Sequence, residues 1–370
     1  MARIVKAEVL MVELVPKVTR TDAIQSFVSQ ETPIVRLTDA DGQAGAGYSY
    51  TIGTGGPAVI SLLRETLLPR LIGREAEEID GIWRDLLFAT HATAVGAITS
   101  LALAAIDTAL WDLRCLRAGM PLWRMAGGAK PSVPLYSTEG GWLHIATEDL
   151  VADALKMQKR GFAGSKIKIG KPTLAEDRAR LKSVRAAVGP GYHILVDANQ
   201  SFTLAEARRR ADMLAEFDID WLEEPMPADD VGAHVNLTAA SPVPIAVGES
   251  MYSISQFKDY LAMGGCTIVQ ADVARVGGIT PWLKIAHMAE AFNVAICPHF
   301  LMELHVSLTC AVPNAPMLEY IPQLDDITTS RLDIRDGQAH APTIPGLGIA
   351  WDWDAINARA VAGLSATIEG

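Results

Sequence analysis

The sequence is poor in cysteine and has no excess of positive charge. It has four cysteines without the paired spacing of a metal site, so we expect free, mostly buried thiols in a reducing compartment. The net charge of -11 argues against a nucleic-acid or anionic membrane surface but allows a local basic pocket for an acidic small molecule. Apolar runs of about 18 residues are missing, and charged residues interrupt the N-terminal stretch where a signal peptide needs an apolar core. We therefore expect a cytoplasmic protein. The cysteines are Cys115, Cys266, Cys297 and Cys310.

A Gly-rich dinucleotide fingerprint is also missing after the strand-like runs, which argues against an open dinucleotide-binding sheet. From about residue 133, eight short apolar runs alternate with segments whose apolar residues recur at helical spacing. Apolar strands between amphipathic helices predict a parallel sheet covered by helices. Eight strands predict an α/β fold of the modified TIM-barrel type, (β/α)7β. The runs are "VPLYST", "SKIKIG", "HILVDANQ", "DWLEEP", "PIAVGES", "TIVQADV", "VAICPH" and "PMLEY".

The first 128 residues follow a different pattern, in which strands come first and helices follow. We predict an α+β capping domain at 1–128, a catalytic barrel at 129–340, and a tail from about 341 to 370 that packs back on the capping domain. The last predicted helix of the capping domain is apolar nearly all round, so we expect it to pack against the barrel. The predicted strands are 2–15, 33–39 and 44–50, and the predicted helices are 57–72, 75–89 and 93–117.

Charged and polar side chains stand where the predicted barrel strands end, which is where active sites of such barrels lie. Each one alone has a structural explanation, such as a helix cap, an ion pair or a satisfied core histidine. Together they would crowd one end of a closed, low-dielectric cylinder, so something must compensate their charge. They are Lys166, Lys168, Asp197, Asn199, Glu223, Glu224, Glu249, Asp272, His299 and Glu319.

Three of these acids follow consecutive strands. Neighbouring strands lie about 4.8 Å apart, so Asp197, Glu223 and Glu249 can converge on one point and would repel without a cation among them. Oxygen ligands alone favour a hard ion, Mg²⁺ first and Mn²⁺ second.

Two basic groups flank this predicted metal site in strand order. Lys168 precedes it and His299 follows it, which predicts a two-sided acid/base site. Lys166 lies on the same side of its strand as Lys168 and should lower the proton affinity of Lys168. Asp272 is placed to orient the His299 imidazole. An edge strand with a wetted face is the alternative explanation of the two lysines.

A divalent ion and ammonium groups near a base suit abstraction of a proton next to a carboxylate, because the enediolate product needs strong charge stabilisation. Lys166 and a protonated Glu319 that donates a hydrogen bond would contribute to it.

Several motifs in order resemble the enolase superfamily, mandelate racemase subgroup, over nearly the whole chain. They are "AAIDTALWDLRCLRAGMPLWRMAGG", "SKIKIG", "VDANQS", "WLEEP", "VGES", "QADVARVGGIT", "PHF" and "LEY". The resemblance implies metal ligands at Asp197, Glu223 and Glu249, a base at Lys168, and a His299 and Asp272 dyad. It also implies an N-terminal capping domain whose loops close over the barrel mouth. Sites of this superfamily use a Lys or His base with Mg²⁺.

This subgroup contains racemases and acid-sugar dehydratases, and the catalytic residues alone do not choose between them. Polar capping loops favour a sugar acid, and "HFLMELHVSL" resembles galactarate and talarate dehydratases. We therefore expect dehydration of an aldarate or aldonate to a 2-keto-3-deoxy acid. A racemase or epimerase of a 2-hydroxy acid such as mandelate, a cycloisomerase, and a non-catalytic binder of acids are the alternatives. The expected substrate-binding residues are Asn199, Arg20, Tyr48 and Tyr50, with Arg20 suited to a distal carboxylate.

The partners we expect are a small acid-sugar substrate and further copies of the chain in a homo-oligomer, with no nucleic acid and no membrane.

Overall fold

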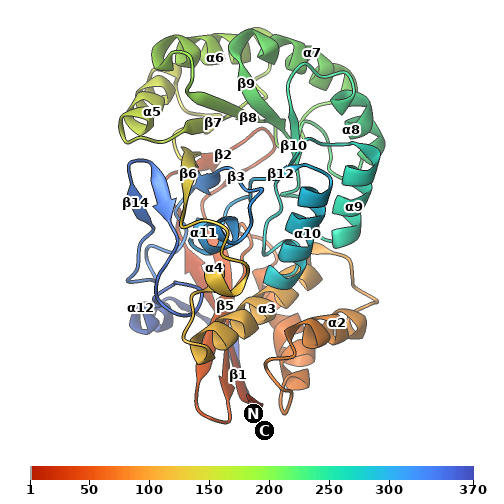
Figure 1. Ribbon diagram of the computed structural model, residues 1–370, viewed down its shortest axis with the longest axis vertical. Helices are drawn as coiled ribbons and strands as arrows, with labels where there is room; N and C mark the ends of the chain where they lie inside the picture. Colours follow the sequence, from red (N-terminus) through yellow and green to blue (C-terminus); the bar gives the residue numbers. More distant parts are fainter. Residues whose placement is uncertain (1) are drawn as a thin grey trace.

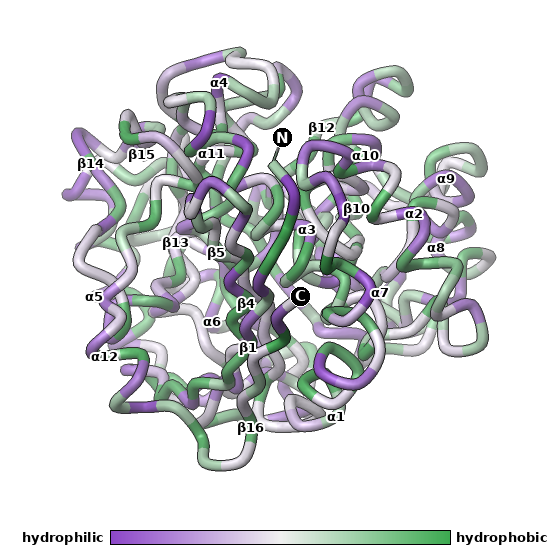
Figure 2. The backbone as a smooth tube through the Cα atoms, turned by 90° about the horizontal axis from the view of Figure 1, so that it is seen from below, coloured by the Kyte–Doolittle hydropathy of each residue, from purple (hydrophilic) through white to green (hydrophobic). Residues whose placement is uncertain are grey.

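The computed structural model describes residues 2–370 and shows a capping unit joined to a larger α/β unit (Figure 1). Met1, where the predicted capping domain begins, lies outside the described residues. The capping sheet is antiparallel with the order β16-β1-β4-β5, so the last strand of the chain pairs with the first. Figure 2 shows β1, β4 and β16 side by side near both chain ends. These strands are β1 (Ile4–Leu14), β4 (Gln30–Asp39), β5 (Ala44–Tyr48) and β16 (Ala360–Glu369).

Helix α3 (Ala97–Arg117) packs closely on β5 because β5 carries glycines at the contact. A Cβ on Gly47 would lie 2.2 Å from the backbone nitrogen of Ala109. On the barrel side, Trp111 of α3 donates its Nε1–H to Thr280 Oγ1 at 2.9 Å. The prediction that this apolar helix packs against the barrel is therefore confirmed. The other helices of this part are α1 (Gly56–Leu62), continued by η1 (Leu63–Leu67) and η2 (Leu68–Arg70), then α2 (Ile79–Ala89) and α4 (Leu122–Met125).

The eight predicted barrel strands are all present and parallel, in the order β13-β6-β7-β8-β9-β10-β11-β12. The last strand of this unit, β13, pairs with its first strand, β6. Seven helices connect them, which gives the predicted (β/α)7β order. The strands are β6 (Ser132–Ser137), β7 (Gly164–Lys168), β8 (His193–Asp197), β9 (Ile219–Glu223), β10 (Ile245–Val247), β11 (Ile268–Val269), β12 (Ala295–Ile296) and β13 (Leu318–Tyr320).

The connecting helices surround the strands (Figure 1), and local sequence marks where several of them begin. Thr173 with Glu176 forms a capping box at α6, and Ser253 with Gln256 forms another at α9. The helices are α5 (Thr147–Lys159), α6 (Leu174–Val188), α7 (Leu204–Leu214) with η3 (Ala215–Phe217), α8 (Val231–Thr238), α9 (Ile254–Met263), α10 (Ile279–Ala291) and α11 (Met302–Ala311). After β13 follow β14 (Asp333–Arg335), β15 (Gln338–His340) and α12 (Trp353–Ala358).

A short hairpin of the capping unit, β2 (Arg20–Thr21) and β3 (Ser26–Phe27), reaches the carboxyl ends of the barrel strands. The backbone nitrogen of Leu143, in the loop after β6, donates to the carbonyl of Thr21 at 2.9 Å. The sequence did not predict this hairpin. Within residues 2–370 no helix combines the length and apolarity needed to cross a membrane. All four cysteines are buried and free, as predicted.

Candidate active site

Three buried carboxylates converge at the ends of three neighbouring strands. Asp197 ends β8, Glu223 ends β9, and the two residues pair directly across the ladder. Glu249 follows β10 by two residues. Each acid offers an oxygen that lies within 4.8 Å of the others. The structure therefore brings together the predicted metal ligands.

Donors from the barrel fix two of these acids. Glu223 Oε2 accepts from Gln270 Nε2 at 2.7 Å and from Trp221 Nε1 at 3.1 Å. Asp197 Oδ1 accepts from the backbone nitrogen of Asn199 at 2.9 Å. The sequence analysis missed Gln270 and Trp221. The signal for Trp221 was available, because it lies two residues before Glu223 on β9 and so shares its side of the strand. Gln270 follows the end of β11, so no strand period marked it.

The three acids fit a hard cation. Burial and the neighbouring Asp197 carboxylate raise the pKa of Glu223 well above its usual range. The charged forms of these acids therefore repel each other, and the negative charge of the cluster is not fully compensated. Glu249 Oε2 is buried without a hydrogen-bond partner. An all-oxygen donor set with an unsatisfied carboxylate oxygen is the chemistry that Mg²⁺ or Mn²⁺ prefers.

The two lysines of β7 are buried and paired, not on a wetted edge. Lys166 Nζ lies 2.8 Å from Glu223 Oε1, 2.9 Å from Glu319 Oε1 and 3.6 Å from Asp197 Oδ2. Burial opposes its charge, but Glu223 and Glu319 outweigh burial and raise the pKa of Lys166 well above its usual range. Lys166 is therefore a fixed cation that neutralises the acids around it.

Lys168 contacts Asp197 Oδ2, and its charge state corrects a prediction. Burial lowers the pKa of Lys168 and so does Lys166, as expected, but the Asp197 carboxylate outweighs both and the net pKa is raised. The sequence predicted that the two lysines are neighbours, but the effect of the Asp197 carboxylate, which lies near both of them, was underestimated. Any process that draws the charge of Asp197 away from Lys168 brings this amine closer to a usable base.

His299 lies at the other end of the acid cluster. Its Nε2 is 3.3 Å from Glu249 Oε2, and its Nδ1 is 2.9 Å from Asp272 Oδ2. Burial would raise the pKa of Asp272, but the hydrogen bond from His299 lowers it, so this carboxylate stays charged and orients the imidazole. Tyr50 donates its hydroxyl to the same Oδ2 at 2.7 Å. The predicted pair of His299 and Asp272 is present, and Tyr50 also contacts Asp272.

Glu319 does not meet the prediction of a protonated donor. Burial would raise the pKa of Glu319, but the Lys166 ammonium lowers it below the usual range. Thr138 Oγ1 donates to Glu319 Oε1 at 2.5 Å, and the Phe300 backbone nitrogen donates to Oε2 at 2.8 Å. Three donors surround it, so Glu319 is favoured as a carboxylate that accepts hydrogen bonds.

The lysines, His299, Glu249 and Glu319 line a small cavity under the β2–β3 hairpin. Its volume is about 30 Å³, which is on the order of one water molecule. The cavity contains a cation that the sequence analysis missed, Arg275, whose guanidinium donates to the Glu249 carbonyl at 2.8 Å. Asp22, which stands in the polar capping loop expected to carry specificity, also lines the cavity, and other lining residues that were not foreseen are Gln25, Phe27, Trp142 and Ile321.

Of the predicted substrate-binding residues, Asn199 and Tyr50 line this cavity and Tyr48 does not. The Tyr48 ring is fully buried and meets Trp351 edge to face, with centroids 5.5 Å apart. Asn199 has a left-handed backbone (φ 44°), and its Oδ1 is buried without a partner.

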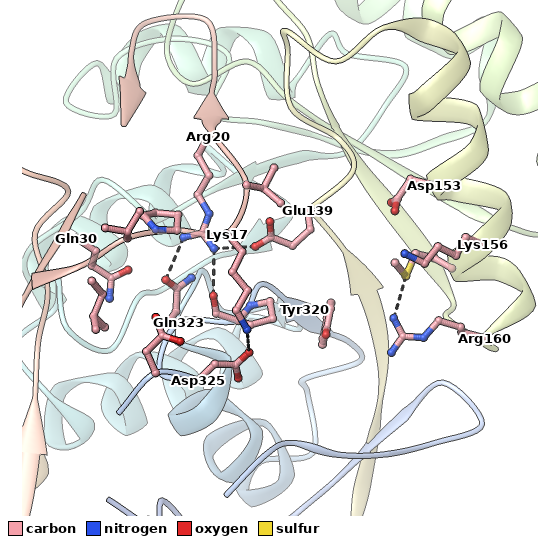
Figure 3. A pocket seen from close by; sticks show the side chains of 17 residues that line it. Lys17, Arg20, Gln30, Glu139, Asp153, Lys156, Arg160, Tyr320, Gln323 and Asp325 are labelled. Carbon is pink, nitrogen blue, oxygen red and sulfur yellow. Dashed lines mark hydrogen bonds and ion pairs between the residues drawn. The ribbon is translucent and has the colours of Figure 1, made fainter. Parts of the chain in front are cut away.

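Arg20 also departs from its predicted role. Its guanidinium donates to Gln323 Oε1 at 3.0 Å, to Glu139 Oε1 at 2.7 Å and to the Pro322 carbonyl at 3.1 Å (Figure 3). It lines a different cavity of about 390 Å³ on the outer side of the hairpin. Both terminal nitrogens of Arg20 bond to loops of the barrel, while its Nε is buried without a partner, so Arg20 anchors the capping hairpin and does not line the cavity beside the acid triad.

Comparison with known proteins places this geometry in a family. The family model for the mandelate racemase / muconate lactonizing enzyme N-terminal domain matches residues 6–127, and the model described as enolase C-terminal domain-like matches residues 149–355. L-Talarate/galactarate dehydratase of Salmonella typhimurium is 35% identical over 315 residues, which are 85% of this chain and 79% of that protein. 3,6-Anhydro-alpha-L-galactonate cycloisomerase of Streptomyces coelicolor is 34% identical over 351 residues, covering 94% and 97%.

Solved structures agree with these relatives. The structure of L-talarate dehydratase from Polaromonas sp. JS666, complexed with Mg and L-glucarate, superposes with a TM-score of 0.93 at 33% identity. The match covers 100% of each chain.

Proposed function

Because the chain belongs to the mandelate racemase subgroup of the enolase superfamily, we propose that it removes water from a sugar acid after abstracting the proton next to a carboxylate. The observation that carries this proposal is the placement of Lys168 and His299. Each contacts a different acid of the triad, Asp197 for the lysine and Glu249 for the imidazole, so a substrate between them has a basic group on either side.

In this proposal Asp197, Glu223 and Glu249 hold one Mg²⁺. When bound, the ion would supply positive charge that stabilises the enediolate, and an Asp197 carboxylate that held it would raise the pKa of Lys168 less. Lys168 Nζ takes the α-proton. Lys166 remains charged between Glu223 and Glu319 and adds to the positive potential where the enediolate oxygens develop.

The β-hydroxyl then leaves with a proton from His299. The C–O bond breaks, the hydroxyl and the Nε2 proton depart as water, and the resulting enol tautomerises to a 2-keto-3-deoxy acid. Asp272, held by Tyr50, stabilises the protonated imidazole before this transfer and fixes which nitrogen faces the substrate.

Polar and charged side chains around the remaining cavity suit a hydroxylated acid. Arg275, Gln25 and Asn199 lie there, and Arg275 replaces Arg20 as the arginine expected to meet a distal carboxylate. A cavity of about 30 Å³ is far below the roughly 300 Å³ or more of typical ligand pockets. The β2–β3 hairpin, which supplies Gln25 to the wall, must therefore move when substrate binds.

A cycloisomerase is the second candidate, since one of the relatives carries that activity and matches nearly its whole length. The same proton abstraction would precede ring opening in place of loss of water.

A substrate screen tests the proposal. The purified protein with Mg²⁺ is incubated with aldonates and aldarates, including galactarate and L-talarate, and 2-keto-3-deoxy products are measured alongside α-proton exchange from deuterated solvent. We expect turnover of at least one acid, and a loss of about 10² to 10⁴-fold in Lys168→Ala and His299→Asn. Lys168→Arg should keep binding and lose exchange. A blank with every acid, together with racemisation of a 2-hydroxy acid, would overturn dehydration.

A further inference from the structure

Trp142 carries an indole N–H without an acceptor. Its side chain is buried, and its Nε1 is among the buried polar atoms that lack a hydrogen-bond partner. A buried donor without an acceptor costs free energy, and each such case in a native protein needs an explanation. Five other tryptophans donate their Nε1–H to a protein acceptor: Trp83, Trp111, Trp123, Trp221 and Trp282.

The loop before Trp142 is built to hold it in place. A Cβ on Gly141 would lie 1.8 Å from the Lys166 carbonyl oxygen, so only glycine allows the loop to touch β7 there. The Lys168 backbone nitrogen donates to the Gly141 carbonyl at 2.8 Å, and Arg180 donates to the Trp142 carbonyl at 3.4 Å. The loop is thus fixed to the strand that carries both lysines.

This placement puts the indole beside the proposed base. Lys168 Nζ lies 5.1 Å from the Trp142 ring centroid, and Phe27 of the capping hairpin meets the ring edge to face at 6.2 Å. Trp142 lines the catalytic cavity together with Asn199, whose Oδ1 is a buried acceptor without a partner. Two residues that line the same cavity therefore carry one unused donor and one unused acceptor, and such groups are what recognition of hydroxyl groups requires.

We propose that Trp142 Nε1–H donates a hydrogen bond to an oxygen of the bound sugar acid on the Lys168 side of the cavity, and so helps to select polyhydroxylated acids. This inference rests on the proposed function. The competing explanation is that the ring only walls off Lys168, in which case the N–H has no part in substrate selection.

The first test observes the N–H directly in the folded protein. Indole N–H resonances are recorded for the His299→Asn protein, which retains Trp142 but is slowed in turnover, before and after Mg²⁺ and then galactarate or L-talarate. Calorimetry on the same samples reports binding. We expect the Trp142 resonance to move when the acid binds, and the Trp123 resonance, whose N–H already has the Pro342 carbonyl at 2.9 Å, to stay.

The second test removes the N–H and keeps an aromatic ring. Trp142→Phe should lower kcat/KM for the sugar acid about tenfold and leave the pH profile of Lys168 unmoved. Trp123→Phe is the matched control, because it removes an indole N–H from a protein acceptor elsewhere and should keep kcat/KM.

The outcomes distinguish a failure of the proposed role of Trp142 from a failure of the proposed function. If an acid binds and neither the Trp142 resonance nor the kcat/KM of Trp142→Phe changes, the indole is only a wall and this inference fails alone. A shifted pH profile in Trp142→Phe with unchanged selectivity among the acids also favours the wall. If no acid binds, the proposed function and this inference fail together.

Discussion

Tyr48 and Tyr50 lie two residues apart at the end of β5, yet only one of their hydroxyls has a hydrogen-bond partner. The Tyr50 hydroxyl donates to Asp272 Oδ2 at 2.7 Å, whereas the Tyr48 hydroxyl is buried without a hydrogen-bond partner. Asp272 in turn holds His299. Hydrogen bonds that support the His299 imidazole therefore extend from the barrel into the capping unit, through the Tyr50 hydroxyl.

Removal of each hydroxyl should have different effects. In Tyr50→Phe, Asp272 loses a donor, and we expect kcat to fall about tenfold with little change in KM, because hydrogen bonds to charged groups contribute about 1.5–3 kcal/mol. Tyr48→Phe should leave kcat unchanged and keep or raise stability, since it removes a buried hydroxyl without a partner. Steady-state kinetics of both variants checks this. Equal losses of kcat in the two variants would contradict the assigned role.

The acids at the strand ends could be predicted from the sequence, but the charge states of Lys168 and Glu319 could not. Strand ends located Asp197, Glu223 and Glu249 because side-chain direction alternates with a fixed period. The proton states of Lys168 and Glu319 depend instead on distances between strands. Asp197 touches Lys168 and raises its pKa, and the Lys166 ammonium 2.9 Å from Glu319 lowers the pKa of that acid.

At the scale of elements, helix α3 joins the two units through buried acids. Asp107 Oδ2 accepts from the Thr280 backbone nitrogen at 2.9 Å, in the first turn of α10, where a carboxylate complements the helix dipole. Asp112 accepts from the backbone nitrogens of Ala46 and Leu347, both at 2.8 Å. Burial raises the pKa of Asp107 to about 7 and that of Asp112 to about 6.

The raised pKa of Asp107 predicts a pH dependence of stability. The folded protein keeps this proton up to about pH 7, while the unfolded chain loses it near the ordinary aspartate pKa of 3.8. The folded state binds more protons between these values, so stability falls as pH rises through that window, by at most on the order of 4 kcal/mol. Thermal unfolding at pH 5.5 and 8.5 should show a smaller decrease for Asp107→Asn than for the wild type.

The matched control for this prediction is Asp212→Asn, since Asp212 is an exposed acid on α7. Its pH dependence should follow the wild type. A decrease in Asp107→Asn as large as that of the wild type would show that Asp107 is charged in the folded state throughout.

Elements that belong to a repeated pattern were predicted well, and isolated short elements were not. Helix α3 carries a long helical period, and the barrel strands recur between helices, so even the two-residue strands β11 and β12 were found. The strands β2 and β3 are equally short but stand outside that repeat. That hairpin nevertheless supplies Asp22, Gln25 and Phe27 to the cavity. The sequence therefore located the residues at the strand ends better than the residues of the hairpin that lies over them.

At the scale of the whole molecule, the capping unit is held on the barrel by contacts between distant parts of the chain. Arg20 pairs with Glu139 and Gln323, which lie 119 and 303 residues away in the sequence. No local pattern encodes such partners, and the predicted substrate role of Arg20 failed for that reason. These contacts hold the hairpin whose residues Asp22, Gln25 and Phe27 line the cavity beside the acid triad.

The acid triad should make stability depend on a divalent cation. Binding to the folded state alone contributes about 2.7 kcal/mol at a hundredfold excess of ion over Kd, so Mg²⁺ should raise the Tm of the wild type by several degrees. Glu249→Gln removes one ligand charge and should lose most of that rise. Glu303→Gln is the control, because Glu303 Oε1 accepts from the Gln323 and Leu324 backbone nitrogens, away from the triad. A rise that persists in Glu249→Gln, or vanishes in Glu303→Gln, would place the ion elsewhere.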